Sequence, residues 1–337
     1  MRVLVLGGAG YIGSHTCVAL AEAGHDVAIA DNYANASPLV LGRLVRILGA
    51  PVDAHECDIR DTERLARLLE DTGSEAVIHF AALKSVARSV ADPLAYFDNN
   101  IAGTISVLRA MRRAGVPHLV FSSSATVYGT DAPVPVREDA HLAPCNPYGR
   151  SKLVMEQLIG DLCVADPGFG AMLLRYFNPV GAHPSGLIGE DPRGVPDNLM
   201  PYVAQVAVGR RDHLQVFGGD WPTPDGTGIR DYVHVMDLAR AHVAALAVLG
   251  EGRRGATALN LGTGLGTSVL DLVQAFGRAC GRDVPYEIVG RRAGDVAELW
   301  ASPDLAREML GWSAQHDVDA MCRDAWRWQS KNPDGYG

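Results

Sequence analysis

The sequence predicts an α/β protein with a Rossmann-type, doubly wound parallel sheet and a smaller C-terminal region. Three observations favour this fold. Apolar strands alternate with helical patterns from residue 1 to about residue 176, a glycine-rich turn follows the first strand, and proline and glycine become dense after residue 177. Strands joined by helices form parallel sheets through right-handed crossovers, with helices on both faces. We therefore expect a first domain over 1–177 and a second over 178–337.

The elements of the first domain follow from hydrophobic spacing and from helix end signals. Expected strands lie at 3–6, 27–30, 76–80, 118–122 and 172–175, and expected helices at 12–23, 62–70, 93–114 and 148–165. The third helix begins with Pro93 in its first turn and ends before Gly115, as helices commonly do. The second domain is expected to consist largely of loops and short helices. A strand around 257–262 is expected to return to the main sheet.

Composition and charge exclude several classes of protein. The chain has 337 residues, of which 47% are hydrophobic, so a packed protein is expected rather than a disordered one. The formal net charge of −9 argues against binding to nucleic acid or to an acidic membrane. The chain lacks an apolar run of about 18 residues, so we expect no membrane span. The six cysteines have neither paired nor zinc-site spacing, which predicts a reduced, cytoplasmic setting and no metal.

A glycine-rich turn joins the first strand to the first helix. Gly7 permits a tight turn, Gly10 lets the backbone approach a pyrophosphate, and Gly13 allows the helix to pack closely on the strand. The N–H groups and the positive end of the helix then favour an anion. A glycine triplet alone is weak evidence, but its place between a strand and a helix favours a dinucleotide site that includes Tyr11 and Ile12.

Two acidic residues, one after the second strand and one after a strand-like stretch, suggest which dinucleotide binds. Asp31 ends the second strand, where a carboxylate accepts hydrogen bonds from the adenosine ribose and repels a 2′-phosphate. This favours NAD over NADP, although a turn-forming aspartate before Asn32 would look the same. Asp58 could hydrogen-bond the adenine, or it could be a helix cap.

A serine, a tyrosine and a lysine form a candidate catalytic group. Residues 122–124 are three serines that end a strand, and Tyr148 and Lys152 lie four residues apart, on one face of the following helix. A free tyrosine has a pKa of about 10 and is a poor base. A nearby ammonium and a positively charged nicotinamide would both favour the phenolate. An isolated pair of this kind is usually a surface lysine beside a core tyrosine, but the strand-end serine and the dinucleotide turn favour catalysis.

These features resemble the extended short-chain dehydrogenase/reductase family, and the match is closest to its UDP-glucose 4-epimerase branch. The glycine turn and the Tyr148–Lys152 pair are shared by the whole superfamily. Four segments are similar to the epimerases in particular: residues 121–129 (FSSSATVYG), 175–186 (RYFNPVGAHPSG), 198–201 (NLMP) and 226–235 (GTGIRDYVHV). The resemblance extends from residue 1 to the Trp326–Trp328 helix near the C-terminus.

The resemblance implies NAD-dependent inversion of C4 of a UDP-hexose through a transient 4-ketose. Tyr148 would take the proton of the 4-hydroxyl group, Ser124 would hydrogen-bond the reacting oxygen, and Lys152 would hold the nicotinamide ribose and tune Tyr148. NAD would stay bound, because the hydride returns in each cycle. Beyond the glycine turn and the Tyr148–Lys152 pair, the cofactor residues implied are Asp31, Asn32, Asp58, Ile59, Phe80, Ala81, Lys84, Asn99, Ser122, Tyr176 and Phe177.

The resemblance also implies a UDP-sugar site. A sugar that must present both faces to one nicotinamide should be held mainly through its nucleotide, with few fixed contacts to the hexose. Arg230 and either Arg291 or Arg292 suit the diphosphate, because arginine is permanently charged and can bind bidentately. The substrate residues implied are Ser124, Tyr148, Asn178, Asn198, Leu199, Phe217, Arg230, Arg291, Arg292, Asp295 and Leu299.

Two residues depart from the pattern of the resembling enzymes. Leu299 stands where enzymes restricted to simple hexoses tend to carry tyrosine and those accepting N-acetylated sugars carry a smaller residue. Leucine is intermediate, so we expect at least weak tolerance of an acetamido group at C2. Arg150 replaces a frequent lysine, and we expect little effect because its spacing turns it away from Tyr148 and Lys152.

Three alternative functions have to be compared with epimerisation, and the helices also predict an assembly. Nucleotide-sugar 4,6-dehydration needs an acid–base pair after the catalytic hydroxyl residue, where this chain has Ala125 and Thr126. An epimerase or decarboxylase acting on a UDP-uronate would need a further cation, and a non-catalytic NAD-binding sensor would not need the catalytic group.

The helices at 93–114 and 148–165 carry surplus apolar positions. Family members pair these helices across a two-fold axis, so a homodimer is expected.

Overall fold

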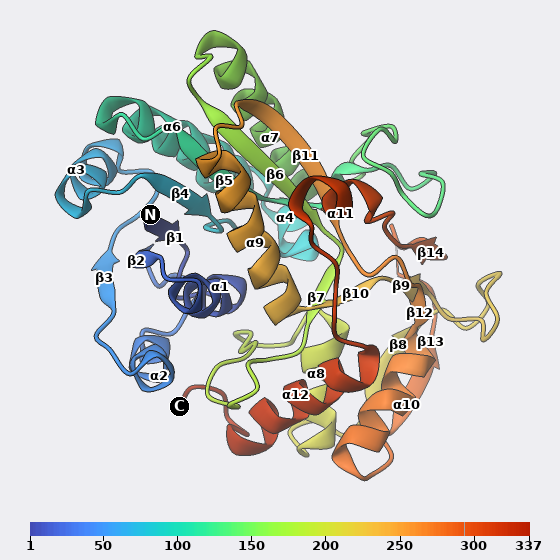
Figure 1. Cartoon of the computed structure of the whole chain (residues 1–337). Coiled ribbons are helices and arrows are strands. Elements are labelled where there is room, and N and C mark those ends of the chain that lie inside the picture. Colours follow the sequence, from blue (N-terminus) through green and yellow to red (C-terminus); the bar gives the residue numbers. More distant parts are fainter. Residues whose placement is uncertain (293) are drawn as a thin grey trace.

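Seven parallel strands form the central sheet of the computed structural model, which describes residues 1–292 and 294–337. The strand order is β11-β6-β5-β4-β1-β2-β3 (Figure 1). The strands are β1 (Arg2–Leu6), β2 (Asp26–Asp31), β3 (Asp53–Glu56), β4 (Ala76–His79), β5 (His118–Ser124), β6 (Gly170–Tyr176) and β11 (Gly255–Leu261). The predicted Rossmann-type parallel sheet is confirmed.

Helices cover both faces of the sheet because alternate strand residues point in opposite directions. Val3, Val5 and Ile29 face one core, together with α1 (Tyr11–Glu22), α2 (Leu39–Leu48) and α9 (Val235–Gly250). Leu4 and Leu6 face the other core, together with α3 (Thr62–Thr72), α6 (Gly103–Ala114) and α7 (Pro147–Ala165). Each central strand is therefore buried on both sides, which explains its continuous apolar sequence.

The chain reverses its direction of travel across the sheet at β1. It runs outward through β2 to β3 and then returns to place β4 on the other side of β1. The carboxyl ends of β1 and β4 thus part around a crevice, which is where ligands bind in open α/β sheets. The glycine turn after β1 and the residues after β4 both lie at this position.

The predicted helix at 93–114 is continuous, but its winding changes along its length. It consists of α5 (Pro93–Tyr96), the π-helix η1 (Phe97–Ala102) and α6. A short helix, α4 (Val86–Ala91), precedes it. Short π-helical segments inside α-helices are frequent at functional sites. The predicted residue Asn99 lies on the π-helical turn.

The expectation of loops and short helices after residue 177 is wrong for much of that region. The helix α9 has 16 residues and packs on α1. The strand expected around 257–262 corresponds to β11, which pairs with β6 along its whole length. The helices α8 (Leu199–Ala207), α10 (Val269–Cys280) and α12 (Val318–Lys331) share a third core and form a group beside the sheet (Figure 1). The high proline and glycine content is concentrated in the segments between these helices. The proposed domain boundary at residue 177 stays a prediction.

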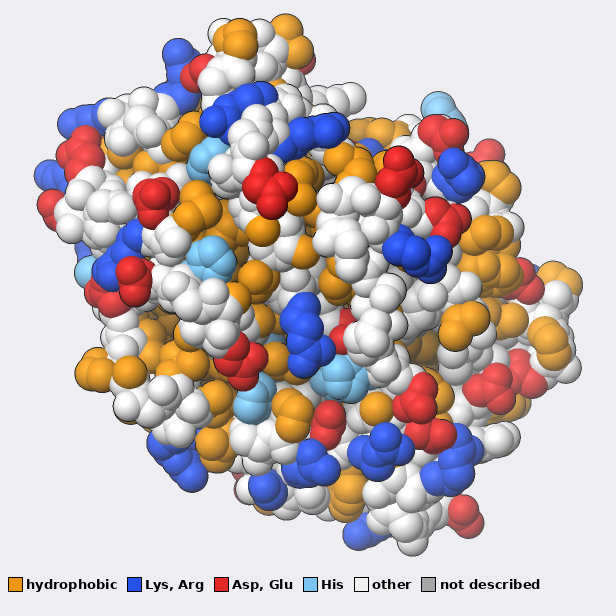
Figure 2. Space-filling model, in the orientation of Figure 1, with side chains coloured by type: hydrophobic (Ala, Val, Ile, Leu, Met, Phe, Trp, Pro, Cys, Tyr) orange, Lys and Arg blue, Asp and Glu red, His pale blue; other side chains and the backbone are white. Residues whose placement is uncertain are grey.

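Short strands and connecting elements complete the C-terminal region. They are β7 (Asn178–Val180), β8 (Leu214–Phe217), β9 (Ile229–Arg230), β10 (Tyr232–His234), β12 (Thr267–Ser268), β13 (Tyr286–Val289), β14 (Glu298–Leu299) and α11 (Asp304–Leu310). A 3-10 turn, η2 (Ala125–Val127), follows β5. The face shown in Figure 2 carries acidic and basic side chains interspersed. No helix in the described part of the chain is both long and apolar enough to cross a bilayer.

Candidate active site

The glycine turn after β1 has the close approaches that the sequence predicts. Gly7 has a φ of +76°, and a Cβ atom there would lie 2.8 Å from the backbone nitrogen of Ala81. At Gly13 a Cβ atom would lie 2.2 Å from the carbonyl oxygen of Gly7. The helix α1 starts at Tyr11 without a side-chain cap and without an acidic residue in its first turn. Its N-terminal N–H groups are therefore suited to an anionic group such as a pyrophosphate.

Asp31 lies beside this turn and helps to shape it. Its carboxylate accepts hydrogen bonds from the backbone N–H groups of Ala9 (3.0 Å) and Tyr33 (2.9 Å), one on each oxygen. A carboxylate has about four lone-pair sites, so both oxygens retain capacity for ribose hydroxyl groups. Burial raises the pKa of Asp31, and the two backbone hydrogen bonds oppose that rise.

The side chains of Asn32 and Asp58 meet next to Asp31. The amide of Asn32 donates to Asp58 at 2.9 Å, and Arg60 donates to both oxygens of the same carboxylate. These contacts hold the pKa of Asp58 well below its usual range, and the hydrogen bonds from Arg60 have the largest effect. The cap of α3 is Asp61, which accepts from the N–H of Arg64, so the helix-cap interpretation of Asp58 is wrong.

The candidate catalytic residues come together because α7 begins directly against the end of β5. A Cβ atom at Gly149 would lie 2.4 Å from the carbonyl oxygen of Thr126, so only glycine allows this approach. Pro147 is in the first turn of α7, and Asn146 caps the helix by accepting from the N–H of Gly149 at 2.8 Å. This start of the helix places Tyr148 beside Ser124, with Lys152 one turn further along.

Lys152 is buried and has a single hydrogen-bond acceptor among the described residues. Its Nζ atom donates to the carbonyl oxygen of Ser122 at 2.6 Å and lies 5.0 Å from the Phe121 ring centroid and 5.9 Å from that of Tyr148. Burial lowers the pKa of Lys152 to about 7, and Glu156 acts in the opposite direction. An ammonium has three donors, so Lys152 retains capacity for a further acceptor.

Tyr148 remains a protonated phenol in the protein alone. Burial raises the pKa of Tyr148 to about 12, and a hydrogen bond with Ser124 partly opposes this rise. The Ser124 hydroxyl accepts from the backbone N–H of Thr126 (3.2 Å) and from its hydroxyl (2.9 Å), which leaves the proton of Ser124 available for donation. Tyr148 therefore needs additional positive charge nearby to become a base at neutral pH.

A buried polar network behind these residues was not predicted. Arg175 binds Glu156 through two hydrogen bonds, of 2.9 and 2.7 Å, and it also donates to the Tyr128 hydroxyl at 2.9 Å. Ser123, the middle of the three serines, donates to Glu156. Glu156 lies one helical turn after Lys152, so a charged residue at helical spacing in an otherwise apolar stretch was the signal available in the sequence.

A second unpredicted residue, Asn100, joins the π-helix to α7. Its carboxamide accepts from the N–H of Leu83 at 2.9 Å, donates to the Leu83 carbonyl at 3.1 Å, and donates to the Ser151 hydroxyl at 3.0 Å. Asn99 donates to the carboxamide oxygen of Asn100 at 3.0 Å. Hydrophobic spacing at the usual helical period does not reveal a π-helical turn, so nothing in the pattern distinguished Asn100 from its neighbour.

The remaining predicted cofactor residues lie around the crevice. Phe80 and Tyr176 both pack on the His242 ring, with Phe80 at 4.7 Å between centroids, and the Tyr176 hydroxyl is hydrogen-bonded to His242. Ala81 lies against the glycine turn, Ile59 is buried, and Phe177 packs with Leu299 in a separate apolar cluster.

One loop of the C-terminal region, residues 190–193, is hydrogen-bonded to the segments that follow β2 and β4, and we call this loop the closing segment. Glu190 accepts hydrogen bonds from Lys84 and Asn198, each at 3.0 Å, and so joins a predicted cofactor residue to a predicted substrate residue. Arg193 donates to the backbone carbonyls of Tyr33 (3.2 Å), Ala34 (2.8 Å) and Ala36 (3.0 Å), just beyond Asp31. Neither Glu190 nor Arg193 was predicted, because both lie in a loop without regular spacing.

The predicted diphosphate residues come from β9 and from the loop after β13. Arg292 donates to Asp295 at 3.1 Å, and its guanidinium lies 5.4 Å from the centroid of the Phe217 ring. Arg230 lies 3.9 Å from the same carboxylate. Arg291 instead binds Asp220 and stacks on Trp221, so the structure separates the two candidate arginines.

Asn178, Leu199 and Leu299 complete the predicted substrate set. Leu299 in β14 is paired with Arg230 in β9, and Asn178 begins β7. Leu199 begins α8, directly after Asn198. In the described residues there is no group of three or more His, Cys, Asp or Glu side chains suited to a metal ion.

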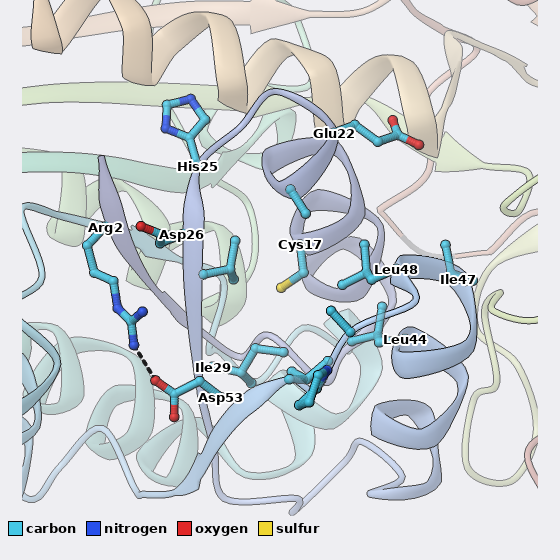
Figure 3. A pocket seen from close by; sticks show the side chains of 15 residues that line it. Arg2, Cys17, Glu22, His25, Asp26, Ile29, Leu44, Ile47, Leu48 and Asp53 are labelled. Carbon is cyan, nitrogen blue, oxygen red and sulfur yellow. Dashed lines mark hydrogen bonds and ion pairs between the residues drawn. The ribbon is translucent and has the colours of Figure 1, made fainter.

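A separate cavity of about 450 Å³ lies between α1, α2 and the edge of the sheet. Figure 3 shows Cys17, Leu44 and Leu48 along its apolar side and the Arg2–Asp53 ion pair on the opposite side. Its lining includes none of the predicted site residues. The candidate site is instead formed by the residues of the glycine turn, the catalytic group and the arginines.

Comparisons with known proteins show which family the chain belongs to. Residues 3–262 match the model of the NAD dependent epimerase/dehydratase family. A UDP-glucose 4-epimerase of Dictyostelium discoideum is 52% identical over 335 residues, which covers 99% of this chain and 97% of that protein. A UDP-glucose 4-epimerase from Stenotrophomonas maltophila, solved with bound NAD and formylated UDP-arabinopyranose, has a TM-score of 0.97 and 54% identity, with 99% of both chains covered.

A second solved structure gives the same result. The UDP-glucose 4-epimerase from Bifidobacterium longum, in complex with NAD+ and UDP, has a TM-score of 0.95 and 48% identity, and the match covers 99% of this chain and 100% of that one. The resemblance inferred from the motifs is thus confirmed along the chain. The chain belongs to the NAD-dependent epimerase/dehydratase family.

Proposed function

We propose that this chain interconverts UDP-glucose and UDP-galactose by NAD-dependent inversion of C4. The observation that carries the proposal is the meeting of Ser124, Tyr148 and Lys152 at the end of β5, beside a glycine turn built for a pyrophosphate. Relatives that match along nearly the whole chain are named UDP-glucose 4-epimerases. An acid–base group beside a dinucleotide site suits a transient oxidation of the substrate.

The residues present fit NAD at the turn. The bare N-terminus of α1 would hold the pyrophosphate, Asp31 would accept the adenosine ribose hydroxyls, and Lys152 would donate to the nicotinamide ribose. Bound NAD supplies the acceptor for the C4 hydride and then the donor that returns it. Asp31 would repel a 2′-phosphate, which favours NAD over NADP.

The chain's own residues handle the proton. Tyr148 would remove the proton of the 4-hydroxyl group as C4 is oxidised. It would return the proton after the 4-ketose has rotated in the pocket to present its opposite face. Ser124, whose proton is free of the Thr126 contacts, would hydrogen-bond the reacting oxygen. The buried Lys152 ammonium would stabilise the phenolate.

We assign the substrate diphosphate to Arg230 and Arg292 rather than Arg291. Arg230 and Arg292 share Asp295, and Arg292 lies over the Phe217 ring, whereas Arg291 is occupied by Asp220. Replacing Arg292 with alanine should raise the KM for UDP-galactose at least about tenfold, and the matched Arg291→Ala variant should change it little. Equal effects of the two variants would contradict the assignment.

Leu299 supports a wider substrate range. Its side chain is aliphatic and packs with Phe177 beside the strand that carries Arg230. We propose weak activity on UDP-N-acetylglucosamine, with Leu299→Tyr as the variant that should remove it and keep UDP-galactose turnover. A coupled assay without conversion above background in the unmodified protein would reject this extension.

We also propose a homodimer in the cytoplasm. Ile101, Ile105, Leu158 and Leu162 are only partly buried on the helices concerned, and Leu94 is 76% exposed. Contact between two copies through these helices would bury them. All six cysteines are free thiols, which suits a reducing compartment. A monomer by light scattering at micromolar concentration would contradict the dimer, and recovery in a membrane or secreted fraction would contradict the location.

The decisive experiment combines release of the cofactor with turnover. The purified protein should release NAD on denaturation and should convert UDP-galactose to UDP-glucose. Tyr148→Phe should abolish turnover while NAD and UDP still bind, which separates an enzyme from a sensor. Turnover of a UDP-uronate without turnover of UDP-galactose would favour the alternative substrate class.

A further inference from the structure

The buried carboxylate of Asp231 binds three backbone N–H groups and one hydroxyl. Its Oδ1 atom accepts from the N–H and the hydroxyl of Thr263, both at 2.7 Å. Its Oδ2 atom accepts from the N–H of Gly264 at 3.0 Å and from that of Ala301 at 3.1 Å. Asp231 is 0% exposed, so these contacts replace water entirely. One side chain thus joins the loop after β11 to the segment after β14.

The backbone of the same residue holds two further segments. The N–H of Asp231 donates to the carbonyl of Leu299 at 3.2 Å, and its carbonyl accepts from the N–H of Asn178 at 2.9 Å. Arg230 precedes Asp231 directly in the chain. Three residues assigned to the UDP-sugar site, from different parts of the sequence, are therefore bonded to Asp231 or adjacent to it.

The packing around Asp231 leaves little freedom for this arrangement. A Cβ atom at Gly262 would lie 2.4 Å from Oδ2 of Asp231 and 2.8 Å from the Cβ atom of Ala301. Glycine at 262 is thus required for the loop to reach the carboxylate. All four hydrogen bonds to the carboxylate come from neutral donors, and a buried charge with such complete partners is held rigidly.

We propose that Asp231 is a positioning residue that holds Arg230, Leu299 and Asn178 in the arrangement that recognises the UDP-sugar. The inference rests on the proposed function, because it concerns the same pocket. Asp231 itself contacts backbone and Thr263 rather than the substrate position. Its loss should therefore weaken nucleotide binding through its neighbours, while the proton chemistry at Tyr148 stays intact.

The test replaces Asp231 with asparagine in the full-length protein that retains its NAD. Asparagine keeps the volume but has one carbonyl oxygen for donors on both sides, so at least one of the two donor pairs loses its acceptor. We expect the Kd for UDP, measured by calorimetry, and the KM for UDP-galactose to rise at least about tenfold. The kcat and the NAD content per chain should change less than about twofold.

A matched control separates positioning from lost stability. Asp237 is equally buried and accepts from the backbone N–H groups of Gln315 and His316, both at 2.9 Å, away from the candidate site. Asp237→Asn should lower the melting temperature to a similar degree and leave UDP binding unchanged. Should Asp231→Asn fail to fold, Gly262→Ala, which pushes on the carboxylate, should give the same increase in Kd.

Each outcome bears on one claim only. Weaker UDP binding in Asp231→Asn or in Gly262→Ala, with normal binding in Asp237→Asn, supports the inference. Unchanged UDP binding in a folded Asp231→Asn variant overturns it, as does an equal loss in the Asp237→Asn control. If the unmodified protein neither binds UDP nor turns over UDP-galactose, the proposed function fails instead.

Discussion

Replacing Lys152 with methionine tests the electrostatic part of the mechanism most directly. Methionine keeps the length of the side chain and removes its charge. The ammonium lies 5.9 Å from the centroid of the Tyr148 ring. With an effective dielectric constant of about 20, a unit charge at that distance contributes roughly 3 kcal/mol, or about two pKa units.

The direction of the change follows from which form of tyrosine the charge favours. An ammonium stabilises the phenolate and so lowers the pKa of Tyr148, and its removal raises that pKa. The acid limb of the kcat profile for UDP-galactose should therefore move about two units to higher pH. At neutral pH, kcat should fall about a hundredfold, because the phenolate fraction falls by that factor.

The assay needs a control because Lys152 is also assigned to the nicotinamide ribose. Lys84→Met removes another cation near the cofactor crevice, but one that binds Glu190 and is half-exposed. That variant should retain less NAD, but the pH at which kcat reaches half its maximum should be the same as in the unmodified protein. If Lys152→Met loads NAD and its pH profile does not move, the role of the ammonium in tuning Tyr148 is refuted.

Three further predictions concern the turn, the closing segment and the buried network. Gly13→Ala should yield protein without NAD, because the added Cβ atom would lie 2.2 Å from the Gly7 carbonyl oxygen. The measurement is the dinucleotide released on denaturation, and full loading with NAD would contradict the prediction. Arg193→Ala removes three hydrogen bonds to backbone carbonyls and should speed exchange of bound NAD with labelled NAD about tenfold, at unchanged kcat per bound NAD; an unchanged exchange rate would show that this contact does not retain the cofactor. Glu156→Gln leaves the buried Arg175 without its counter-charge and should lower the free energy of unfolding in urea by about 3–5 kcal/mol; a loss below about 1 kcal/mol would refute that account.

Local signals predicted most of the first half of the fold, although not the helix α2, because that half is built largely from local rules. Runs such as Val3–Leu6 are apolar and short, and two of the helical patterns that follow such runs end at a glycine, at Gly24 and Gly115. Right-handed crossovers then leave few arrangements of the strands. The helices after residue 177 were underestimated because proline and glycine between them masked amphipathic patterns that pack on one another.

The candidate site divides in the same way. Gly13, Tyr148 and Lys152 stand at fixed spacings inside single elements, so the sequence alone indicated them. Asn100 and Asp231 act through contacts between segments far apart in the chain, and no spacing reports such contacts. The choice between Arg291 and Arg292 was equally out of reach, since neighbouring residues in a loop point in directions that only the surrounding strands decide.

The pKa values of the free protein connect binding of the cofactor to catalysis. With the pKa of Tyr148 near 12, the chain by itself holds the phenol protonated at neutral pH, and burial works against the full charge of Lys152 by lowering its pKa. The remaining positive charge has to arrive in the crevice from elsewhere, and an oxidised nicotinamide carries it. If the Arg193 contacts retain the dinucleotide as predicted, they act on the base as well. Any variant that shortens the residence of NAD should lose turnover in proportion to the NAD it loses, whereas a variant of Tyr148 should lose turnover at full occupancy.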